Sequence, residues 1–203
     1  MSMKELIFGA GNKAKVQQLK DALEGLNIEV SSIKDLDIDL PEVEEDGATV
    51  VENARKKSVA YAKAIDQIVF SMDNALYFEG VDDSEQPGLF VRRINGFEAS
   101  NDAEMLQHYS DFLSEKGGKL DAHWEYALSI AQPDGTSVED TIISPRKFVS
   151  NPSSTVVEGY PLEAIQIDPE TGMYISEMTD RQRAEYWQRA VGQPLKDFIS
   201  ANL

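Results

Sequence analysis

Apolar positions near the N-terminus alternate between short continuous runs and longer stretches with helical spacing. Residues 4–8, 28–33 and 68–72 are short apolar runs, and each of them predicts a buried strand. Residues 13–26 place leucines and a valine at helical spacing, so we expect an amphipathic helix after the first strand. This alternation of strands and helices indicates a mixed α/β domain.

The remaining pattern predicts further helices and a hairpin. The expected elements are a helix at 102–115, strands at 124–131 and 137–144, a helix beginning at Thr179, and a terminal helix at 195–203. The polar, acidic residues 78–88 have the composition of an insertion or a loop. We expect four arginines at the surface or in an interface, namely Arg92, Arg93, Arg181 and Arg183.

Residues 40–57, LPEVEEDGATVVENARKK, join an acidic turn to a strongly signalled helix start. Thr49 and Glu52 have the spacing of a capping box, in which both side chains accept hydrogen bonds from backbone N–H groups. Asn53 and Lys57 lie one turn apart, so both can face the same neighbour. Carboxylates before the helix and a lysine along it suit a metal-bound polyphosphate, although an ordinary capped, solvent-facing helix gives the same pattern.

A glycine turn at residues 9–12 separates the first strand from the first helix. In such a unit the backbone N–H groups and the helix N-terminus can hold a phosphate group. Two motifs compete at this turn. Its glycines and Ala14 fit the dinucleotide fingerprint, with Asp35 at about the right distance for a ribose contact. The same turn followed by Lys15 is a nucleotide-phosphate turn, and this alternative is favoured because no second mononucleotide-type half is evident.

Asp73 and Asn74 follow the third apolar run, at 68–72. An acid at the C-terminal end of a buried strand lies where open α/β sheets place catalytic groups. The same Asp-Asn pair also has the composition of a simple turn, so both interpretations stay open for these residues.

Charge and composition limit the kinds of partner. The 203 residues include 36 acidic and 19 basic ones, for a net charge of −17. This field repels polyanions, so we expect neither nucleic-acid nor anionic-membrane binding. With no cysteine and two histidines, any metal is expected to be a hard cation held by carboxylates. We expect a cytoplasmic protein, since the N-terminal residues lack a signal-peptide pattern and no apolar run reaches the ~18 residues of a membrane span.

Three motifs occur in the order and spacing of one known family. They are Gly11-Asn12-x-x-Lys15, then Glu44-Glu45-x-Gly47-x-Thr49-x-x-Glu52-Asn53-Ala54-x-x-Lys57, then the acid after the third apolar run. On these residues the chain resembles the ITPase-like, Ham1-type nucleoside triphosphate pyrophosphatases, which clear inosine and xanthosine triphosphates. Weaker matches at Pro87-Gly88, Arg93 and 186–190 extend the resemblance over nearly the whole chain.

The resemblance implies a mechanism and a set of site residues. Glu45 would help to hold Mg²⁺, and Asp73 would be the metal-linked general base for the water that attacks the α-phosphorus. Lys57 would act in both catalysis and triphosphate binding. Tyr160 and Arg189 would hold the nucleobase of the substrate. The full set of residues assigned to the substrate is Asn12, Lys15, Lys57, Asn74, Tyr160 and Arg189.

Several positions depart from the family pattern. The Asp-Asp-Ser-Gly sequence after the third strand is here Met72-Asp73-Asn74-Ala75, so a thioether replaces one carboxylate. Because successive strand residues point to opposite faces, Met72 need not face the metal as Asp73 does. Pro161 follows Tyr160, and Gln188 replaces a histidine. The residues expected to bind the nucleobase therefore depart further from the family pattern than those expected to bind the phosphates.

We therefore expect one ITPase-like domain over residues 1–203, with a long, twisted, mixed sheet, helices around it, and a nucleotide cleft between two lobes. The smaller lobe would cover roughly residues 75–150. The leading function is Mg²⁺-dependent hydrolysis of a nucleoside triphosphate to the monophosphate and pyrophosphate, in a homodimer as the family implies. The alternative is a nucleotide-binding or scaffold protein that lost catalysis with Met72 and Ala75. A dinucleotide-dependent oxidoreductase is a third possibility.

Overall fold

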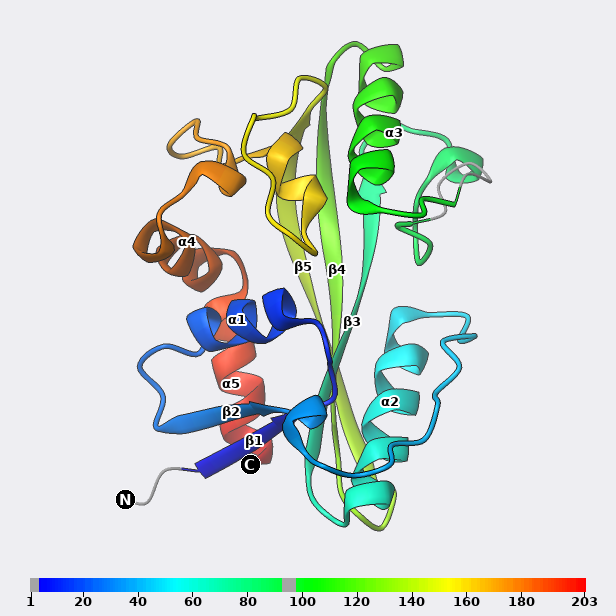
Figure 1. Cartoon of the computed structure of the whole chain (residues 1–203), viewed down its shortest axis with the longest axis vertical. Helices are drawn as coiled ribbons and strands as arrows, with labels where there is room; N and C mark the ends of the chain where they lie inside the picture. The colour runs from blue at the N-terminus through cyan, green and yellow to red at the C-terminus, as the bar shows by residue number, and fades with distance from the viewer. Residues whose placement is uncertain (1–3, 93–97) are drawn as a thin grey trace. The chain divides into compact units, whose positions relative to one another are not determined.

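The computed structural model describes residues 4–92 and 98–203 (Figure 1). Within these residues six strands form one sheet, in the order β2-β1-β3-β4-β5-β6. The strands are β1 (Lys4–Phe8), β2 (Ile28–Ser32), β3 (Val69–Phe78), β4 (Lys119–Ala131), β5 (Ser137–Val149) and β6 (Gln166–Ile167). The α-helices are α1 (Lys13–Ala22), α2 (Val50–Ile65), α3 (Asp102–Glu115), α4 (Asp180–Trp187) and α5 (Gln193–Asn202). In the described part of the chain, no helix has the length and apolarity needed to cross a membrane.

The sheet combines parallel and antiparallel pairs. β1 lies between β2 and β3 and pairs parallel with both, whereas β5 and β6 are antiparallel. The register sets Leu6 opposite Val30, and Ile7 opposite Val69. All four side chains are buried, as expected for parallel strands covered on both faces. The predicted mixed α/β sheet flanked by helices is thus confirmed.

The first helix is shorter than its apolar spacing predicts. α1 begins after Asn12, whose Oδ1 accepts the N–H of Ala14 at 2.9 Å, and it ends at Ala22 rather than at residue 26. Gly25 has a φ of 93°, in the left-handed region that glycine adopts without cost, and turns the chain toward β2. Leu23 is still buried in this turn, so the apolar spacing continues beyond the helix.

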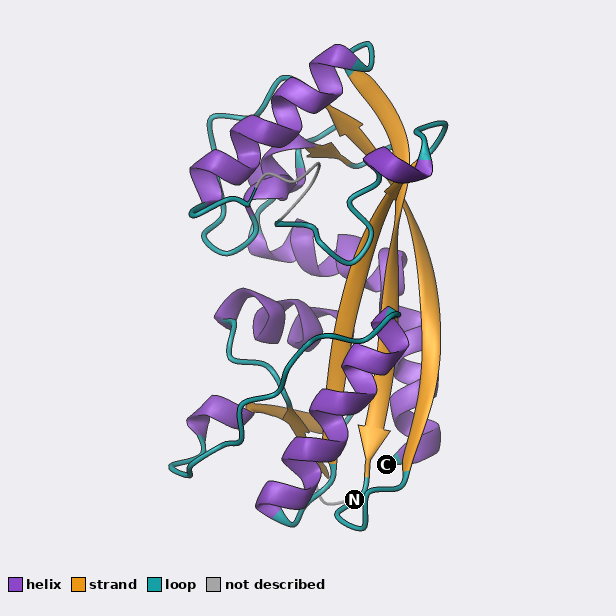
Figure 2. Ribbon diagram, turned by 90° about the vertical axis from the view of Figure 1, so that its right-hand side faces the viewer, coloured by secondary structure: helices purple, strands orange, loops and turns teal. Residues whose placement is uncertain are grey.

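The chain divides into two compact units. Unit 1 holds Met1–Asn74, Glu125–Ile142 and Trp187–Leu203, and unit 2 holds Ala75–Trp124 and Ile143–Tyr186. In unit 1, α2 packs along the sheet (Figure 2). Ala62 of this helix lies in one buried cluster with Ile7, Val69 and Ala131, and Tyr61 packs against the same cluster. The helix that carries Lys57 is therefore anchored to β1 and β3 by apolar contacts.

In unit 2, α3 packs against aromatic side chains from two strands. The helix covers Asp102–Glu115, as its spacing predicts, and Asn101 caps it by accepting a backbone hydrogen bond of 2.9 Å. The ring centroid of Phe78 lies 5.4 Å from that of Phe112 and 5.1 Å from that of Phe148. These three buried rings form part of the core of the unit.

β3 is longer than its sequence predicts. It continues past the expected end at residue 72 to Phe78. Leu76 and Gly88 exchange two backbone hydrogen bonds, of 3.1 and 3.0 Å, so the end of the polar stretch 78–88 turns back to pair with the strand. β4 (Lys119–Ala131) is the neighbour of β3 in the sheet, so a strand far along the chain supplies backbone partners that local composition does not reveal.

Candidate active site

Lys57 lies between two carboxylates in unit 1. Its Nζ is 3.2 Å from Oδ1 of Asp73 and 3.3 Å from Oε1 of Glu45. The side chains of Lys57 and Asp73 are 10% and 12% exposed, whereas the side chain of Glu45 is 53% exposed. We call these three residues the Lys57 cluster. A loop, a helix and a strand thus bring together three residues that the motifs assign to catalysis and metal binding.

Thr49 caps α2 as its sequence predicts, but the reciprocal bond of Glu52 goes to Ala48 rather than to Thr49. Thr49 Oγ1 accepts the N–H of Glu52 at 3.2 Å. Glu52 Oε2 in turn accepts the N–H of Ala48 at 2.7 Å, one residue before the capping position. The first bond satisfies a backbone donor of the first helical turn, and the second holds the residue that precedes the cap. The helix therefore starts at a defined residue, which fixes the position of Lys57 along it.

Asn53 ties the acidic loop to the helix one turn before Lys57. Its Oδ1 accepts the N–H of Gly47 at 2.8 Å, and Asn53 is 4% exposed. A Cβ at Gly47 would lie 2.5 Å from Asn53 Oδ1 and 2.9 Å from Glu52 Cβ, closer than such atoms approach one another. Glycine permits this approach, and the approach holds Glu45 beside Lys57.

The glycine turn lies beside β3. Gly9 donates its N–H to the carbonyl oxygen of Phe70 at 2.8 Å. Lys15 Nζ donates to Asn74 Oδ1 at 3.3 Å, so two further residues of the predicted substrate site are in contact. Asn12 uses its Oδ1 to cap α1. Its amide Nδ2 is the group that can donate to a ligand.

Asp73 does not end its strand, so the expectation of a strand-end carboxylate is wrong. It lies in the middle of β3 (Val69–Phe78), because the strand continues beside its neighbour β4. Met72 is 7% exposed and Ala75 is fully buried. Because side chains alternate along a strand, Met72 points to the opposite face from Asp73. The thioether at position 72 therefore leaves the contact between Asp73 and Lys57 undisturbed.

The Lys57 cluster suits a hard divalent cation with few protein ligands. Among residues 4–92 and 98–203, no three His, Asp or Glu side chains are grouped so as to hold a metal. The carboxylates of Glu45 and Asp73 nevertheless converge on one ammonium group. Mg²⁺ is commonly held by one or two carboxylates, with water and substrate phosphates as its other ligands. The donor set fits Mg²⁺ that arrives with a polyphosphate.

The two residues expected to bind the nucleobase lie in different units. Tyr160 precedes the 3₁₀-helix Pro161–Ile165 in unit 2, and Arg189 lies in the π-helix Gln188–Gly192 of unit 1. Arg93, a weaker match of the sequence, lies outside the described residues. The predicted base site therefore stays a prediction.

Arg183, expected at the surface or in an interface, is half-buried and pairs with a buried glutamate in unit 2. Glu163 is 3% exposed, and Nη1 of Arg183 donates to its Oε2. Burial raises the pKa of Glu163 to about 7, against the opposing charges of Arg183 and Arg146. Burial outweighs the ion pair because the carboxylate loses nearly all of its water. The motifs miss this pair, because 20 positions separate the two residues and no motif contains Glu163.

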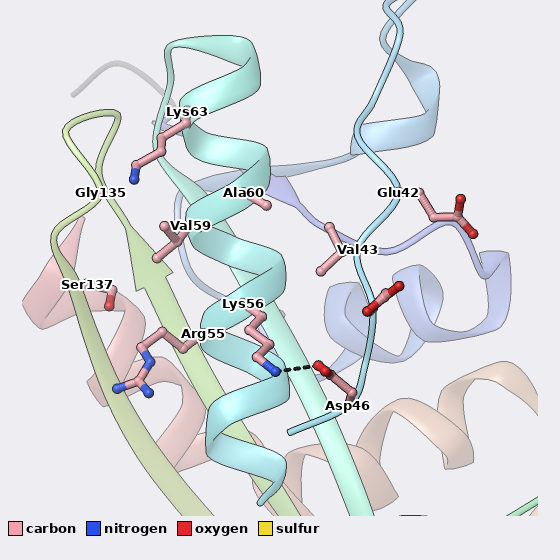
Figure 3. A pocket seen from close by; sticks show the side chains of 11 residues that line it. Glu42, Val43, Asp46, Arg55, Lys56, Val59, Ala60, Lys63, Gly135 and Ser137 are labelled. Carbon is pink, nitrogen blue, oxygen red and sulfur yellow. Dashed lines mark hydrogen bonds and ion pairs between the residues drawn. The ribbon is translucent and has the colours of Figure 1, made fainter. Parts of the chain in front are cut away.

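A groove of about 690 Å³ lies between the loop 42–46 and α2 (Figure 3). Lys56 and Asp46 form an ion pair across it, and this pair lowers the pKa of Asp46. Lys57 and Asp73 do not line the groove. We therefore place the candidate active site at the Lys57 cluster, where Glu45 and Asp73 meet one ammonium group, rather than in this groove.

A model of the Ham1 family matches residues 6–191 of the chain. The chain belongs to the Ham1 family. This membership confirms the resemblance that the motifs around Lys15, Lys57 and Asp73 indicate.

Curated relatives of this Ham1-family chain are bacterial proteins named dITP/XTP pyrophosphatase. The protein from Exiguobacterium sibiricum is 28% identical over 200 residues, which cover 97% of this chain and 96% of the relative. The protein from Geobacter sulfurreducens is 30% identical over 133 residues, which cover 66% of this chain and 65% of the relative. The second alignment thus spans just under two thirds of the relative's length.

Solved Ham1 structures have the same fold. The Staphylococcus aureus Ham1 protein superimposes with a TM-score of 0.70 at 22% identity, covering 98% of this chain and all of the other. A HAM1 protein from Coxiella burnetii gives a TM-score of 0.74 at 19% identity, with the same coverage. These comparisons show that the Ham1-family chain has the Ham1 fold.

Proposed function

We propose that this Ham1-family chain is a Mg²⁺-dependent pyrophosphatase of nucleotide-pool house-cleaning. Its substrates are inosine- and xanthosine-type nucleoside triphosphates or their deoxy forms, and its products are the monophosphate and pyrophosphate. The observation that carries the proposal is the Lys57 cluster, in which Glu45 and Asp73 converge on one lysine. The names of the curated relatives support the same reaction and substrate class.

In this proposal the chain acts mainly by positioning and by neutralising charge, which is what phosphoryl chemistry needs. Lys15 and Lys57 bind phosphate oxygens, and the N–H groups of the glycine turn and Asn12 Nδ2 add hydrogen bonds. Glu45 and Asp73 hold Mg²⁺, which neutralises phosphate charge when it is bound. Asn74 keeps the Lys15 ammonium beside β3 through their 3.3 Å contact.

Asp73 is the general base of the proposed reaction. Its carboxylate accepts a proton from water, whose oxygen forms a bond to the α-phosphorus. The bond from the α-phosphorus to the bridging oxygen breaks, and pyrophosphate leaves with that electron pair. Lys57 stabilises negative charge on the phosphate in the transition state. Tyr160 and Arg189 hold the nucleobase of the substrate, and Arg189 contacts a carbonyl oxygen of the nucleobase.

The alternative is a nucleotide-binding or scaffold protein without turnover. The buried Met72, which replaces a carboxylate of the family pattern, is the observation that favours it. In that case the phosphate side would still bind nucleotide through Lys15 and Lys57, but no pyrophosphate would be released.

The deciding experiment measures pyrophosphate release from ITP, XTP, dITP, GTP, ATP and the pyrimidine triphosphates, with and without Mg²⁺. Wild type is compared with Asp73→Asn and with Asp46→Asn, a control whose carboxylate is exposed in the groove. We expect metal-dependent release, fastest with ITP, XTP or dITP, that Asp73→Asn abolishes and Asp46→Asn retains. Nucleotide binding without any release would establish the alternative, and the absence of both would exclude the two functions together.

We also propose that the protein acts in the cytoplasm as a homodimer, since the family pattern implies a dimer. Light scattering of the purified protein measures its mass in solution. A monomer mass at micromolar concentration would contradict the dimer.

A further inference from the structure

A lysine that no motif contains lies against the glycine turn. A Cβ built on Gly11 would be 2.7 Å from Cγ of Lys34 and 3.0 Å from its Cε. The aliphatic part of Lys34 therefore lies directly over Gly11, and its ammonium group is one bond beyond. Gly11 is the centre of the turn that the proposed function uses to hold phosphate.

The position of Lys34 is set by a short helix with its own cap. The 3₁₀-helix Ile33–Asp35 follows β2, and Ser32 Oγ accepts the N–H of Lys34 at 3.1 Å. The same hydroxyl donates to the carbonyl oxygen of Ala10 at 2.7 Å, which ties this helix to the glycine turn. Asp35 Oδ2 accepts the N–H of Ser32 at 3.2 Å and completes the capping box. The backbone of Lys34 is thus held beside the turn.

The ammonium group of Lys34 is not engaged by any residue that the structure describes. Among the residues that the structure describes, it forms no hydrogen bond and no ion pair. The carboxylate of the adjacent Asp35 is engaged by the backbone of Ser32. Lys34 is exposed, so a ligand can reach it. An exposed lysine usually has only water around it, so the case for a ligand rests on its place at the turn and on the charge of the site.

The side chains of the Lys57 cluster and Lys15 do not offset the negative charge of a bound triphosphate. The ammonium groups of Lys15 and Lys57 are offset by the carboxylates of Glu45 and Asp73, so these four side chains together carry no net charge. A nucleoside triphosphate carries about four negative charges, and one divalent cation neutralises about half of them. Lys34 adds one positive charge at the turn, in a chain whose net charge of −17 otherwise opposes anion binding.

The order of contacts indicates which part of the substrate Lys34 meets. In the proposed reaction, Asp73 acts at the α-phosphorus. Asn74 follows Asp73 on β3 and contacts Lys15 of α1, and α1 begins directly after the glycine turn. Along this path the turn and Lys34 lie beyond the α-phosphate position. We propose that Lys34 binds the pyrophosphate end of the triphosphate as a third cation. This inference rests on the proposed function and adds a substrate-binding residue to it.

The test compares Lys34→Ala with Lys20→Ala, a lysine-to-alanine control in the last turn of α1. Isothermal titration calorimetry with inorganic pyrophosphate and Mg²⁺, and separately with inosine monophosphate, measures binding without turnover. Lys34→Ala is expected to weaken pyrophosphate binding about 5-fold, the upper range for a solvent-exposed ion pair, and the loss grows at low ionic strength. Inosine monophosphate binding stays within about 2-fold, and Lys34→Arg restores most of the pyrophosphate affinity. With ITP as substrate, KM rises and kcat stays near that of wild type.

Failure of this inference differs from failure of the proposed function. If wild type releases pyrophosphate from ITP but Lys34→Ala binds pyrophosphate as Lys20→Ala does, the role of Lys34 is wrong and the function stands. Equal weakening of pyrophosphate and monophosphate binding would also overturn the assignment, because it would show a general effect of charge. If wild type neither hydrolyses a triphosphate nor binds pyrophosphate, both proposals are wrong. A circular dichroism melt of each variant shows whether the fold is retained.

Discussion

Replacement of Gly47 by alanine tests how the acidic loop is held beside Lys57. The new Cβ would lie 2.5 Å from Oδ1 of Asn53 and 2.9 Å from Cβ of Glu52. Glu52 Cβ is attached to the helix backbone and cannot rotate away. The loop must therefore move away from α2, which breaks the 2.8 Å hydrogen bond from Gly47 N–H to Asn53 Oδ1.

The magnitude follows from the burial of this hydrogen bond. Asn53 is 4% exposed, so its Oδ1 is left without water when the loop moves. An unsatisfied buried acceptor costs about 1–3 kcal/mol, and we expect Gly47→Ala to lower the free energy of unfolding by about 2 kcal/mol. For a chain of this size that corresponds to a decrease in Tm of roughly 4–8 °C. Movement of Glu45 away from Lys57 should also raise the Mg²⁺ concentration needed for half-maximal pyrophosphate release.

Urea denaturation and a Mg²⁺ titration of pyrophosphate release measure the two effects. Asp46→Ala is the control in the same loop, and it should shift the denaturation midpoint only slightly, because an exposed ion pair contributes little to stability. Asn53→Ala removes the acceptor and its clash but leaves Glu52 Cβ in place, so Gly47→Ala should cost less in that background than in wild type. Wild-type stability of Gly47→Ala, or an equal loss in both backgrounds, would show that this contact does not hold the loop.

Three further outcomes are expected. Lys57→Met should lower the rate of pyrophosphate release by at least about 100-fold in a steady-state assay, because it removes the charge that faces the transition state, and a smaller loss would contradict its catalytic role. Phe78→Ala should lower the free energy of unfolding by about 3–5 kcal/mol, measured by urea denaturation, because it removes the ring that packs on Phe112 and leaves a cavity. A loss below about 1 kcal/mol would show that this core is not close-packed. The pKa of Glu163 is raised from 4.5 to about 7, so the folded state binds its proton more tightly and wild type loses stability as the pH rises through this window. Glu163→Gln lacks this loss, so its free energy of unfolding relative to wild type should rise by up to about 3 kcal/mol between pH 4.5 and 7. If denaturation at several pH values gives the same difference between variant and wild type, the shifted pKa is refuted.

Features that depend on residues within one turn or one helix are predictable from the sequence. The capping residue Thr49 starts α2 where its spacing predicts, and Asn12 and Asn101 cap the helices that follow them. Such bonds join groups two to four positions apart, so the sequence contains both partners side by side. The motif residues Lys15 and Lys57 were found for a related reason, since each lies at a fixed spacing within its own motif.

Contacts with a partner far along the chain are not visible in local sequence patterns. Local patterns place Asp73 at a strand end, but β3 continues beside β4, which lies far along the chain. Composition places Arg183 at the surface or in an interface, and only the structure pairs it with Glu163, which no motif contains.

The chain's sequence was sufficient to establish its family, its alternation of strands and helices, and the residue types of its phosphate and metal chemistry. Caps, turns and apolar spacing carry that information because they act over a few neighbouring positions. Tertiary structure alone decided which of these groups meet. It brings Lys15 to Asn74, 59 positions away, and lays Lys34 over Gly11. Such contacts depend on how strands pair and how helices pack on them, and many distant residues set that arrangement together.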